Sequence, residues 1–284
     1  MSGPVALVTG ASSGMGEAFT RDLVRQGWHV AMLDLRPNPK IIDDLGDNVS
    51  YYKGNVADYD SQAQCFQAAY DRYGRLDLVC LNAGMIDRSS LYILKNKNDH
   101  DTIPPAPDLS CTDVNVKGVY YGTQLAIHFM RKNKETLPGG SNIIVTASAS
   151  SLYPHECYPE YSGSKAAVWN FVRSMARVLK MKENIRINSI RPGFVLTGLA
   201  PPGMVDAIDR RNTTPISTIV RALNQILGDH KLLGAALECS IEKIILTPEP
   251  EFLNGEPSAR AGFVWEPGFT ALHGEPSNLP DAAP

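Results

Sequence analysis

Residues 5–19, VALVTGASSGMGEAF, run from an apolar β-branched stretch through a glycine-rich turn into a segment whose apolar residues have helical spacing. Glycines stand at positions 10, 14 and 16. Glycine at such positions allows a tight turn, close approach of backbone N–H groups to a pyrophosphate, and close packing of a helix on a strand. The stretch therefore predicts the first strand, the phosphate-binding turn and the first helix of a dinucleotide-binding sheet.

The chain as far as residue 193 repeats this alternation of strands and helices. Runs typical of strands lie at 29–34, 49–54, 76–82, 142–148 and 185–193, and helical spacing is found at 16–27, 59–74 and 162–180. Strands that alternate with helices form parallel sheets. We therefore predict an α/β fold, a single-domain doubly wound parallel sheet of the Rossmann type.

The remaining segments complete the predicted organisation. Its parts are a domain over residues 1–268, substrate loops at 85–108 and 194–230, and a flexible C-terminal tail at 269–284. The loop at 85–108 is expected to lie over the edge of the sheet. Residues 233–246 are predicted to form a helix, and residues 261–268 a last strand.

Composition and charge exclude several classes of protein. The 284 residues are 43% apolar, which allows a sizeable core, and the formal net charge of −3 gives no basic surface for nucleic acid. The N-terminal stretch lacks the pattern of a secretion signal, and no run of ~18 consecutive apolar residues occurs. No nucleic-acid or membrane partner is expected, and the expected location is cytoplasmic.

The cysteines give no sign of a disulfide framework or a metal site. There are five, an odd number, and no two have the CxxC spacing. We expect them to be reduced and mostly buried. His155 and Cys157 lie two residues apart, but no second pair of ligands accompanies them. No metal is therefore expected.

Asp34 bears on the choice of dinucleotide. It ends the second predicted strand, where a carboxylate can accept hydrogen bonds from the ribose hydroxyls of an adenosine. A phosphate on the 2′-hydroxyl would be repelled there by up to ~4 kcal/mol. Asp34 therefore favours NAD over NADP. Arg36 argues the other way, because a guanidinium can bind a 2′-phosphate, although it can equally be a solvated loop residue.

The stretch PEYSGSKAAVW, residues 159–169, places Tyr161 one helical turn before Lys165. Alone, the pair can be two polar residues on a solvated helix face. It follows a strand that ends near Ser148, however, and ligands bind at the carboxyl ends of strands in such sheets. A free tyrosine, with a pKa of about 10, is a poor base, but a lysine ammonium and a nicotinamide cation both favour its phenolate. Ser148 can hold a substrate oxygen by a hydrogen bond.

Six motifs in this order resemble the short-chain dehydrogenase/reductase family: TGASSGMG at 9–16, LNAG at 81–84, VNVKG at 114–118, Ser148, YSGSK at 161–165 and RPGFVLT at 191–197. The resemblance implies a catalytic set of Asn115, Ser148, Tyr161 and Lys165. In this set Tyr161 is the general acid/base, Lys165 also binds the nicotinamide ribose, and Asn115 anchors a water relay to Lys165.

The resemblance, together with the glycine-rich turn and Asp34, also implies a set of cofactor-binding residues. They are Gly10, Ser12, Ser13, Gly14, Met15, Gly16, Asp34, Asn55, Val56, Asn82, Ala83, Gly84, Tyr161, Lys165, Pro192, Gly193, Val195 and Thr197. Asn55 stands where the family usually has Asp, and its side-chain oxygen can still accept a hydrogen bond from adenine. Leu81 stands where a second Asn is common. The segment VWEPG at 264–268 departs from the usual C-terminal pattern.

The expected activity follows from these features. The NAD preference, the long loop and the divergent end resemble the branch that holds 15-hydroxyprostaglandin dehydrogenase and alcohol dehydrogenases of secondary metabolism. We expect NAD-dependent interconversion of a secondary alcohol and a ketone on a bulky, largely apolar small molecule. The alternatives are an NADP-dependent ketoreductase, or a protein of this fold that senses dinucleotides or catalyses a cyclisation.

Substrate residues are expected in the segments that the family varies. Tyr153, His155 and Tyr158 form an aromatic and polar wall just past Ser148, or else pack on neighbouring loops or on a partner chain. Leu199 and Met204 belong to a segment that is either a mobile lid or a plain surface helix.

Assembly into a homodimer or homotetramer is expected. Residues 166–179 are apolar around most of their predicted helix, which indicates burial on two sides. The family resemblance implies that subunits pair through this helix and a second one around 113–132.

Overall fold

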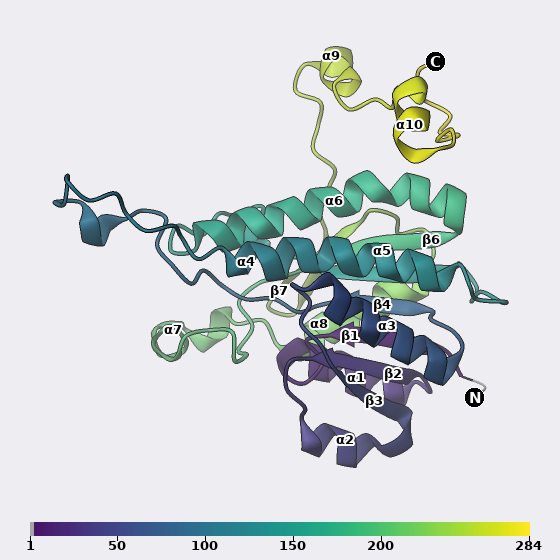
Figure 1. The fold of residues 1–284 in the computed structure, drawn as a ribbon, viewed down its shortest axis with the longest axis horizontal. Coiled ribbons are helices and arrows are strands. Elements are labelled where there is room, and N and C mark those ends of the chain that lie inside the picture. Colours follow the sequence, from purple (N-terminus) through teal and green to yellow (C-terminus); the bar gives the residue numbers. More distant parts are fainter. Residues whose placement is uncertain (1–2) are drawn as a thin grey trace.

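The computed structural model describes residues 3–284 and has one eight-stranded sheet in the order β3-β2-β1-β4-β5-β6-β7-β8 (Figure 1). Seven strands are parallel, and β8 pairs antiparallel with β7. The strands are β1 (Val5–Thr9), β2 (His29–Asp34), β3 (Val49–Lys53), β4 (Leu78–Leu81), β5 (Ser141–Thr146), β6 (Ile185–Pro192), β7 (Ala236–Ser240) and β8 (Lys243–Leu246). The predicted doubly wound α/β sheet is confirmed.

Helices cover both faces of this sheet, so the central strands are buried throughout and read as continuous apolar runs. One face is covered by α1 (Gly14–Arg25), α2 (Pro39–Leu45) and α8 (Ile216–Gly228). The other is covered by α3 (Tyr59–Tyr73), α5 (Gly118–Met130) and α6 (Pro159–Glu183), and Figure 1 shows α5 and α6 running side by side. The shorter helices are α4 (Ser110–Thr112), α7 (Pro202–Ala207), α9 (Gly255–Arg260) and α10 (Glu266–His273).

The strand order positions the site. After β3-β2-β1 the chain crosses to the other side of β1, and β4 and β5 continue the sheet in the opposite direction. At such a reversal the loops after neighbouring strands diverge and leave a crevice at the carboxyl ends of the strands. The crevice therefore lies beyond the ends of β1 and β4.

The prediction of a helix at 233–246 is wrong. These residues form β7, a tight turn and β8. The segment is rich in helix-forming residues, but Leu237 and Cys239 are fully buried beside β6 while Glu238 between them is partly exposed, which is the alternation of a strand. The turn contains Ile241 at φ 53°, a conformation that a β-branched residue rarely adopts. A sequence pattern gives no sign of such a turn.

The strand predicted at 261–268 is also wrong, and the end of the chain is folded. Trp265 makes a single bridge to Ala283, and α10 follows directly. Ser277 is buried, and its amide donates to Glu266 at 2.8 Å. In place of the flexible tail expected at 269–284, this end folds back on itself and lies beyond α6 (Figure 1).

The loop at 85–108 differs from expectation in its position. Residues 90–109 are all exposed, and the only regular element among them is a 3₁₀ turn, Leu94–Asn96. Figure 1 shows this loop projecting away from the helices and strands, so it does not lie over the sheet edge. Among residues 3–284, no helix combines the length and the apolar character needed to cross a membrane.

Candidate functional site

A cavity of about 450 Å³ opens at the carboxyl ends of the strands. It brings together residues that are far apart in the sequence. Of the predicted cofactor-binding residues it is lined by Gly10, Ser13, Gly14, Met15, Asp34, Asn55, Val56, Asn82, Ala83, Gly84, Tyr161, Lys165, Pro192, Gly193, Val195 and Thr197. Ser12 and Gly16 lie in the same glycine-rich turn but behind the lining. Sequence analysis did not single out Met85, Ile86 and Thr146, which also line the cavity and stand beside the recognised motifs.

The glycine-rich turn between β1 and α1 has the shape that a phosphate site needs. Gly10 and Gly14 adopt φ of +65° and +54°, which favour glycine. A Cβ on Gly16 would lie 2.0 Å from the Gly10 carbonyl oxygen, so the helix packs closely on the turn. The Ser13 side chain does not cap α1, and the first amides of this helix are left for another acceptor. These features fit a dinucleotide pyrophosphate.

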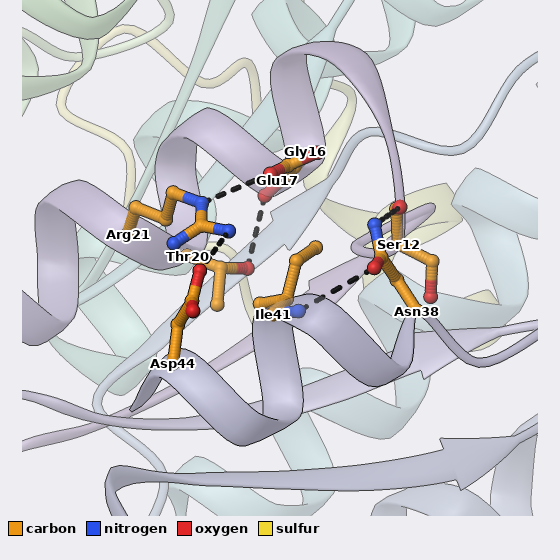
Figure 2. Close-up of polar contacts among 8 residues, drawn as sticks. All are labelled: Ser12, Gly16, Glu17, Thr20, Arg21, Asn38, Ile41 and Asp44. Atoms are coloured by element: carbon orange, nitrogen blue, oxygen red, sulfur yellow. Dashed lines mark hydrogen bonds and ion pairs between the residues drawn. The ribbon is translucent and has the colours of Figure 1, made fainter. Parts of the chain in front are cut away.

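Neighbouring side chains hold this turn in place (Figure 2). The Asn38 amide group donates to the Ser12 carbonyl at 2.9 Å, and its oxygen accepts from the Ile41 amide at 3.4 Å, so it links the turn to the start of α2. Within α1, the Thr20 hydroxyl donates to the Gly16 carbonyl at 2.9 Å. Arg21 extends from α1 to Asp44 of α2 at 2.9 Å. The turn is therefore preorganised.

Asp34 lies at the end of β2 with its carboxylate at the cavity. One oxygen accepts from the Ser12 amide at 3.0 Å and the other from the Arg36 amide at 3.2 Å. A carboxylate has about four lone-pair sites, so both oxygens keep capacity for ribose hydroxyls. Among the described residues that line the cavity, Asp34 is present and Arg36 is not. The Arg36 residue is exposed to solvent.

Asn82 ties together the ends of three strands. Its side-chain amide donates to the Thr9 carbonyl of β1 at 3.1 Å, and its side-chain oxygen accepts from the Thr146 hydroxyl of β5 at 3.2 Å. The Thr9 hydroxyl in turn accepts from the backbone amides of Asn82 and Ala83. Leu81, which precedes Asn82, is buried in the core of the sheet. The floor of the cavity is thus a hydrogen-bonded network. Leu81, which stands where a second Asn is common in the family, adds an apolar contact beneath it.

Ser148, Tyr161 and Lys165 all line the same cavity. Ser148 follows β5, and its hydroxyl accepts from the Ser150 amide at 3.1 Å. Tyr161 and Lys165 share one face of α6, and the Lys165 Nζ lies 5.8 Å from the centroid of the Tyr161 ring. The Lys165 Nζ donates to the Thr146 carbonyl at 2.7 Å. The side chain of Lys165 is therefore fixed between β5 and α6.

Burial has the largest effect on the pKa values of Tyr161 and Lys165. Desolvation raises the pKa of Tyr161, and a hydrogen bond with Ser148 opposes this by lowering it. Desolvation lowers the pKa of Lys165 to about 8. The phenol is thus the stable form of Tyr161 in the protein alone, whereas sequence reasoning stressed the influences that favour the phenolate. A positive charge close to the ring is needed to shift that balance.

Asn115 lies behind the cavity in a π-helical turn, Asp113–Lys117, just before α5. Its side chain pairs with the backbone of Met85: the Met85 amide donates to Oδ1 and Nδ2 donates to the Met85 carbonyl, each at 2.9 Å. It also donates to the Ser164 hydroxyl at 2.9 Å. A Cβ on Gly84 would lie 3.2 Å from Asn115 Oδ1 and 3.4 Å from Lys165 Nζ, so Asn115 and Lys165 both approach this glycine.

Four of the five predicted substrate residues line the cavity. His155, Tyr158, Leu199 and Met204 line it, and the His155 and Tyr158 rings are 5.1 Å apart between centroids. Tyr153 lines a second hollow of about 340 Å³. Ser148 and Tyr161 line both spaces, so the two hollows meet at these side chains. Met204 belongs to α7, a helix of six residues.

An open parallel sheet, a glycine-rich turn at an uncapped helix and a Ser, Tyr and Lys set at one cavity define the class of nicotinamide-dinucleotide oxidoreductases. A family model described as short chain dehydrogenase matches residues 4–203. The chain belongs to the short-chain dehydrogenase/reductase family, as its motifs predicted. Members of this family bind a nicotinamide dinucleotide.

Similar proteins cover most of the chain. Short-chain dehydrogenase/reductase prx6 of Penicillium rubens is 45% identical over 99% of this chain and 97% of its own length. The 15-hydroxyprostaglandin dehydrogenase [NAD(+)] of Rattus norvegicus is 33% identical over 69% of this chain and 70% of its own length. A 3-ketoacyl-(acyl-carrier-protein) reductase of Brucella melitensis has the same fold, with a TM-score of 0.70 and 22% identity over 84% of this chain and 97% of that chain.

Proposed function

We propose that this protein is an NAD-dependent alcohol dehydrogenase/reductase that interconverts a secondary alcohol and a ketone. The observation that carries the proposal is the meeting of Ser148, Tyr161 and Lys165 at one cavity. The same cavity is lined by the glycine-rich turn, so a nicotinamide and a substrate oxygen can both reach these side chains. NAD supplies a hydride acceptor when bound.

Each side chain has a distinct role in this proposal. The Ser148 hydroxyl holds the substrate oxygen by a hydrogen bond. Tyr161 moves the proton to or from that oxygen through its phenolic hydroxyl. Lys165, held by Thr146, keeps a cation beside the Tyr161 ring and also binds the nicotinamide ribose. Asn115 anchors a water relay from Lys165 and is itself held by the Met85 backbone.

Asp34 supports NAD as the dinucleotide. Its carboxylate stands at the cavity beside the phosphate-binding turn, and a 2′-phosphate there would meet a like charge. The name of the Rattus norvegicus relative, which includes NAD(+), agrees with this choice. The remaining cofactor-binding residues are proposed as the sequence motifs imply.

An NADP-dependent ketoreductase is the second candidate. The exposed Arg36 is close enough in sequence to Asp34 to reach a 2′-phosphate. The raised pKa of Tyr161 also suits a phenol that donates its proton to a ketone oxygen, which is the direction of reduction. Comparing the two dinucleotides in solution decides between the candidates.

The two hollows support a bulky substrate with a central oxygen. Because both spaces meet at Ser148 and Tyr161, a carbon bonded to the reacting oxygen can carry one substituent in each. That arrangement favours a ketone over an aldehyde. Tyr153 and His155 would contact the substituent in the second hollow, and Tyr158, Leu199 and Met204 the substituent in the first. We propose a largely apolar small molecule, of secondary metabolism.

Assembly into a homodimer or homotetramer is proposed through α5 and α6. Tyr120 of α5 is 40% exposed and packs on Phe171 of α6 with ring centroids 4.4 Å apart, so the two helices present a joint aromatic surface. A mass of about 31 kDa in solution would contradict the assembly. All five cysteines are free, which agrees with a reducing, cytoplasmic location.

The variant Tyr161→Phe tests the proposed reaction. We expect kcat with NAD+ and bulky secondary alcohols to fall by about 10²–10⁴-fold, because the proton carrier is lost, while NAD+ still binds. Tyr59→Phe is the matched control, since Tyr59 is exposed on α3. Undiminished NAD+ reduction by Tyr161→Phe would refute the proposal. A dinucleotide sensor or a cyclisation catalyst would instead keep its ligand response or its product in this variant.

A further inference from the structure

The start of α6, which carries Tyr161, is capped from outside the helix. The first amides of a helix have no partner within it. The preceding residue, Tyr158, gives no side-chain cap. Instead the carboxylate of Asp87 accepts from the Glu160 amide at 3.0 Å and from the Tyr161 amide at 2.7 Å. Both oxygens of Asp87 therefore hold the backbone at or beside Tyr161.

A second carboxylate, that of Glu160, connects α6 to Thr112 of α4. Oε1 of Glu160, which is buried, accepts from the Thr112 amide at 2.7 Å and from its hydroxyl at 2.8 Å. The Cys111 thiol donates to the Met85 carbonyl at 3.1 Å. The acids and the thiol lie close enough together to suggest metal ligands, yet each already serves a hydrogen bond within the protein. Their common effect is to join α4, α6 and the segment that begins at Met85.

We propose that Asp87 is a positioning residue for Tyr161. The proposal rests on the proposed function, because it gives Tyr161 the proton transfer. Hydrogen bonds from helix amides to a carboxylate are charge-assisted and are favoured further by the helix dipole. The bond to the Tyr161 amide acts on the same residue whose hydroxyl must meet the substrate oxygen. A small rotation of the first turn would move that hydroxyl out of reach.

Lys165 is held by a contact that does not involve Asp87. An experiment can therefore distinguish an effect on Tyr161 from an effect on Lys165. Lys165 lies one turn after Tyr161 on α6, and its Nζ donates to the Thr146 carbonyl of β5. Loss of the Asp87 cap should therefore disturb Tyr161 more than Lys165. Proton transfer should suffer while binding of the dinucleotide persists.

The cap also connects Tyr161 to the substrate. Met85 and Ile86, directly before Asp87, line the cavity. A molecule that contacts Met85 or Ile86 thus acts on the backbone next to the cap. The position of Tyr161 therefore depends on residues 85–87, which connect the cavity lining to the cap.

The experiment compares Asp87→Ala, Asp87→Asn and the exposed control Asp101→Ala from the same loop. For Asp87→Ala we expect kcat to fall about tenfold to 100-fold, with the Kd for NAD+ within about twofold of the unmodified protein. Amide hydrogen exchange at Glu160 and Tyr161 should become at least about tenfold faster. Asp87→Asn, which keeps one acceptor, should lie between, and Asp101→Ala should match the unmodified protein.

An unchanged kcat in Asp87→Ala would overturn the proposal, even if exchange at the two amides became faster. Equal losses of kcat and of NAD+ affinity would also overturn it, because they indicate a general structural role. If Asp87→Ala does not fold, Asp87→Asn decides by the same two readouts. Hydrogen exchange reports on the cap without any turnover, so a failure of the proposed reaction and a failure of the cap remain distinguishable.

Discussion

Lys165 shows the cost of placing a charge inside the site. Its pKa of about 8, in place of 10.5, results from burial. That difference corresponds to about 3 kcal/mol against the charged form. Below pH 8 the folded and unfolded chains both bind the proton and the cost is fully present. Between about 8 and 10.5 only the unfolded chain binds it, so the Lys165 contribution makes stability rise with pH in this window.

The variant Lys165→Met should therefore be more stable and less active. We expect the free energy of unfolding at pH 7 to rise by about 2 kcal/mol, after about 1 kcal/mol for the lost bond to Thr146. At pH 9.5 the gain should be close to zero. Urea unfolding at both values, with the exposed Lys117→Met as control, measures this. A loss of stability at pH 7 would show that the charge is not destabilising.

Two helical glycines, one closely packed and one with open space around it, test the packing of the glycine-rich turn. A Cβ on Gly16 would meet the Gly10 carbonyl at 2.0 Å, whereas a Cβ on Gly163 of α6 would meet nothing within 4 Å. Gly16→Ala should lower the free energy of unfolding by about 3 kcal/mol or more and weaken NAD+ binding. Gly163→Ala should raise stability by about 0.5–1 kcal/mol, since alanine favours a helix. Thermal unfolding and calorimetry compare them, and equal stability of the two variants would contradict the packing.

Among individual residues, the sequence predicted the site residues that lie in motifs and missed those that only the folding of the chain brings to the site. Gly10, Asp34 and Tyr161 could be found because strand ends and spacing identify them. Asp87 could not, since it stands in an irregular segment, and its partner Tyr161 is brought to it only by the packing of α6. Likewise, burial of Tyr161, which raises its pKa, depends on neighbours that no spacing reveals.

Among the elements, α8 depends on one buried arginine. Arg186 of β6 is 1% exposed, and its Nη1 donates to the carbonyls of Ile226 and Asp229 at 3.0 and 2.9 Å. It thus satisfies carbonyls at the end of a helix, which have no partner within it. Burial lowers the pKa of the guanidinium, which shows that part of this benefit is offset by desolvation.

We expect Arg186→Met to lower the free energy of unfolding by about 2 kcal/mol, because buried carbonyls lose their donors. Salt should not change the effect, since the site is shielded from solvent. Urea unfolding at low and high salt tests this, with Arg25→Met, whose side chain is 76% exposed, as control. A variant as stable as the unmodified protein would mean that the carbonyls find other donors.

The elements that the sequence predicted correctly are those whose local pattern agrees with their place in the fold. The central strands β1, β2 and β4 are largely apolar, β6 carries three isoleucines among buried polar residues, and the helices between the strands show one apolar face. The misread pair, β7 and β8, joins leucines, alanines and glutamates with a turn at Ile241 that lacks glycine or asparagine. Pairing with β6 overrides the helical preference there. Similarly, Phe263, Val264 and Trp265 favour a strand by their aromatic and β-branched character, but they lie just before α10, and Trp265 makes a single bridge to Ala283.

For the whole molecule, the cavity is a product of topology. The reversal of strand order at β1 brings the glycine-rich turn, the end of β2 and the start of α6 to one crevice. The motif order along the chain predicted this meeting, because the carboxyl ends of parallel strands share one edge. The position of the loop at 85–108 and the folded C-terminal end could not be predicted, since neither segment has a repeating pattern.

The preference of the cavity for NAD+ over NADP+ is measured by calorimetric titration of both dinucleotides into the same purified sample. We predict that NAD+ binds at least about tenfold more tightly, because Asp34 accepts the ribose hydroxyls and repels a 2′-phosphate. Asp34→Ala should bring the two affinities within about threefold of each other, while Asp43→Ala, at an exposed acid of α2, should keep the preference. Tighter binding of NADP+, or a preference for NAD+ that survives in Asp34→Ala, would contradict the proposed role of Asp34.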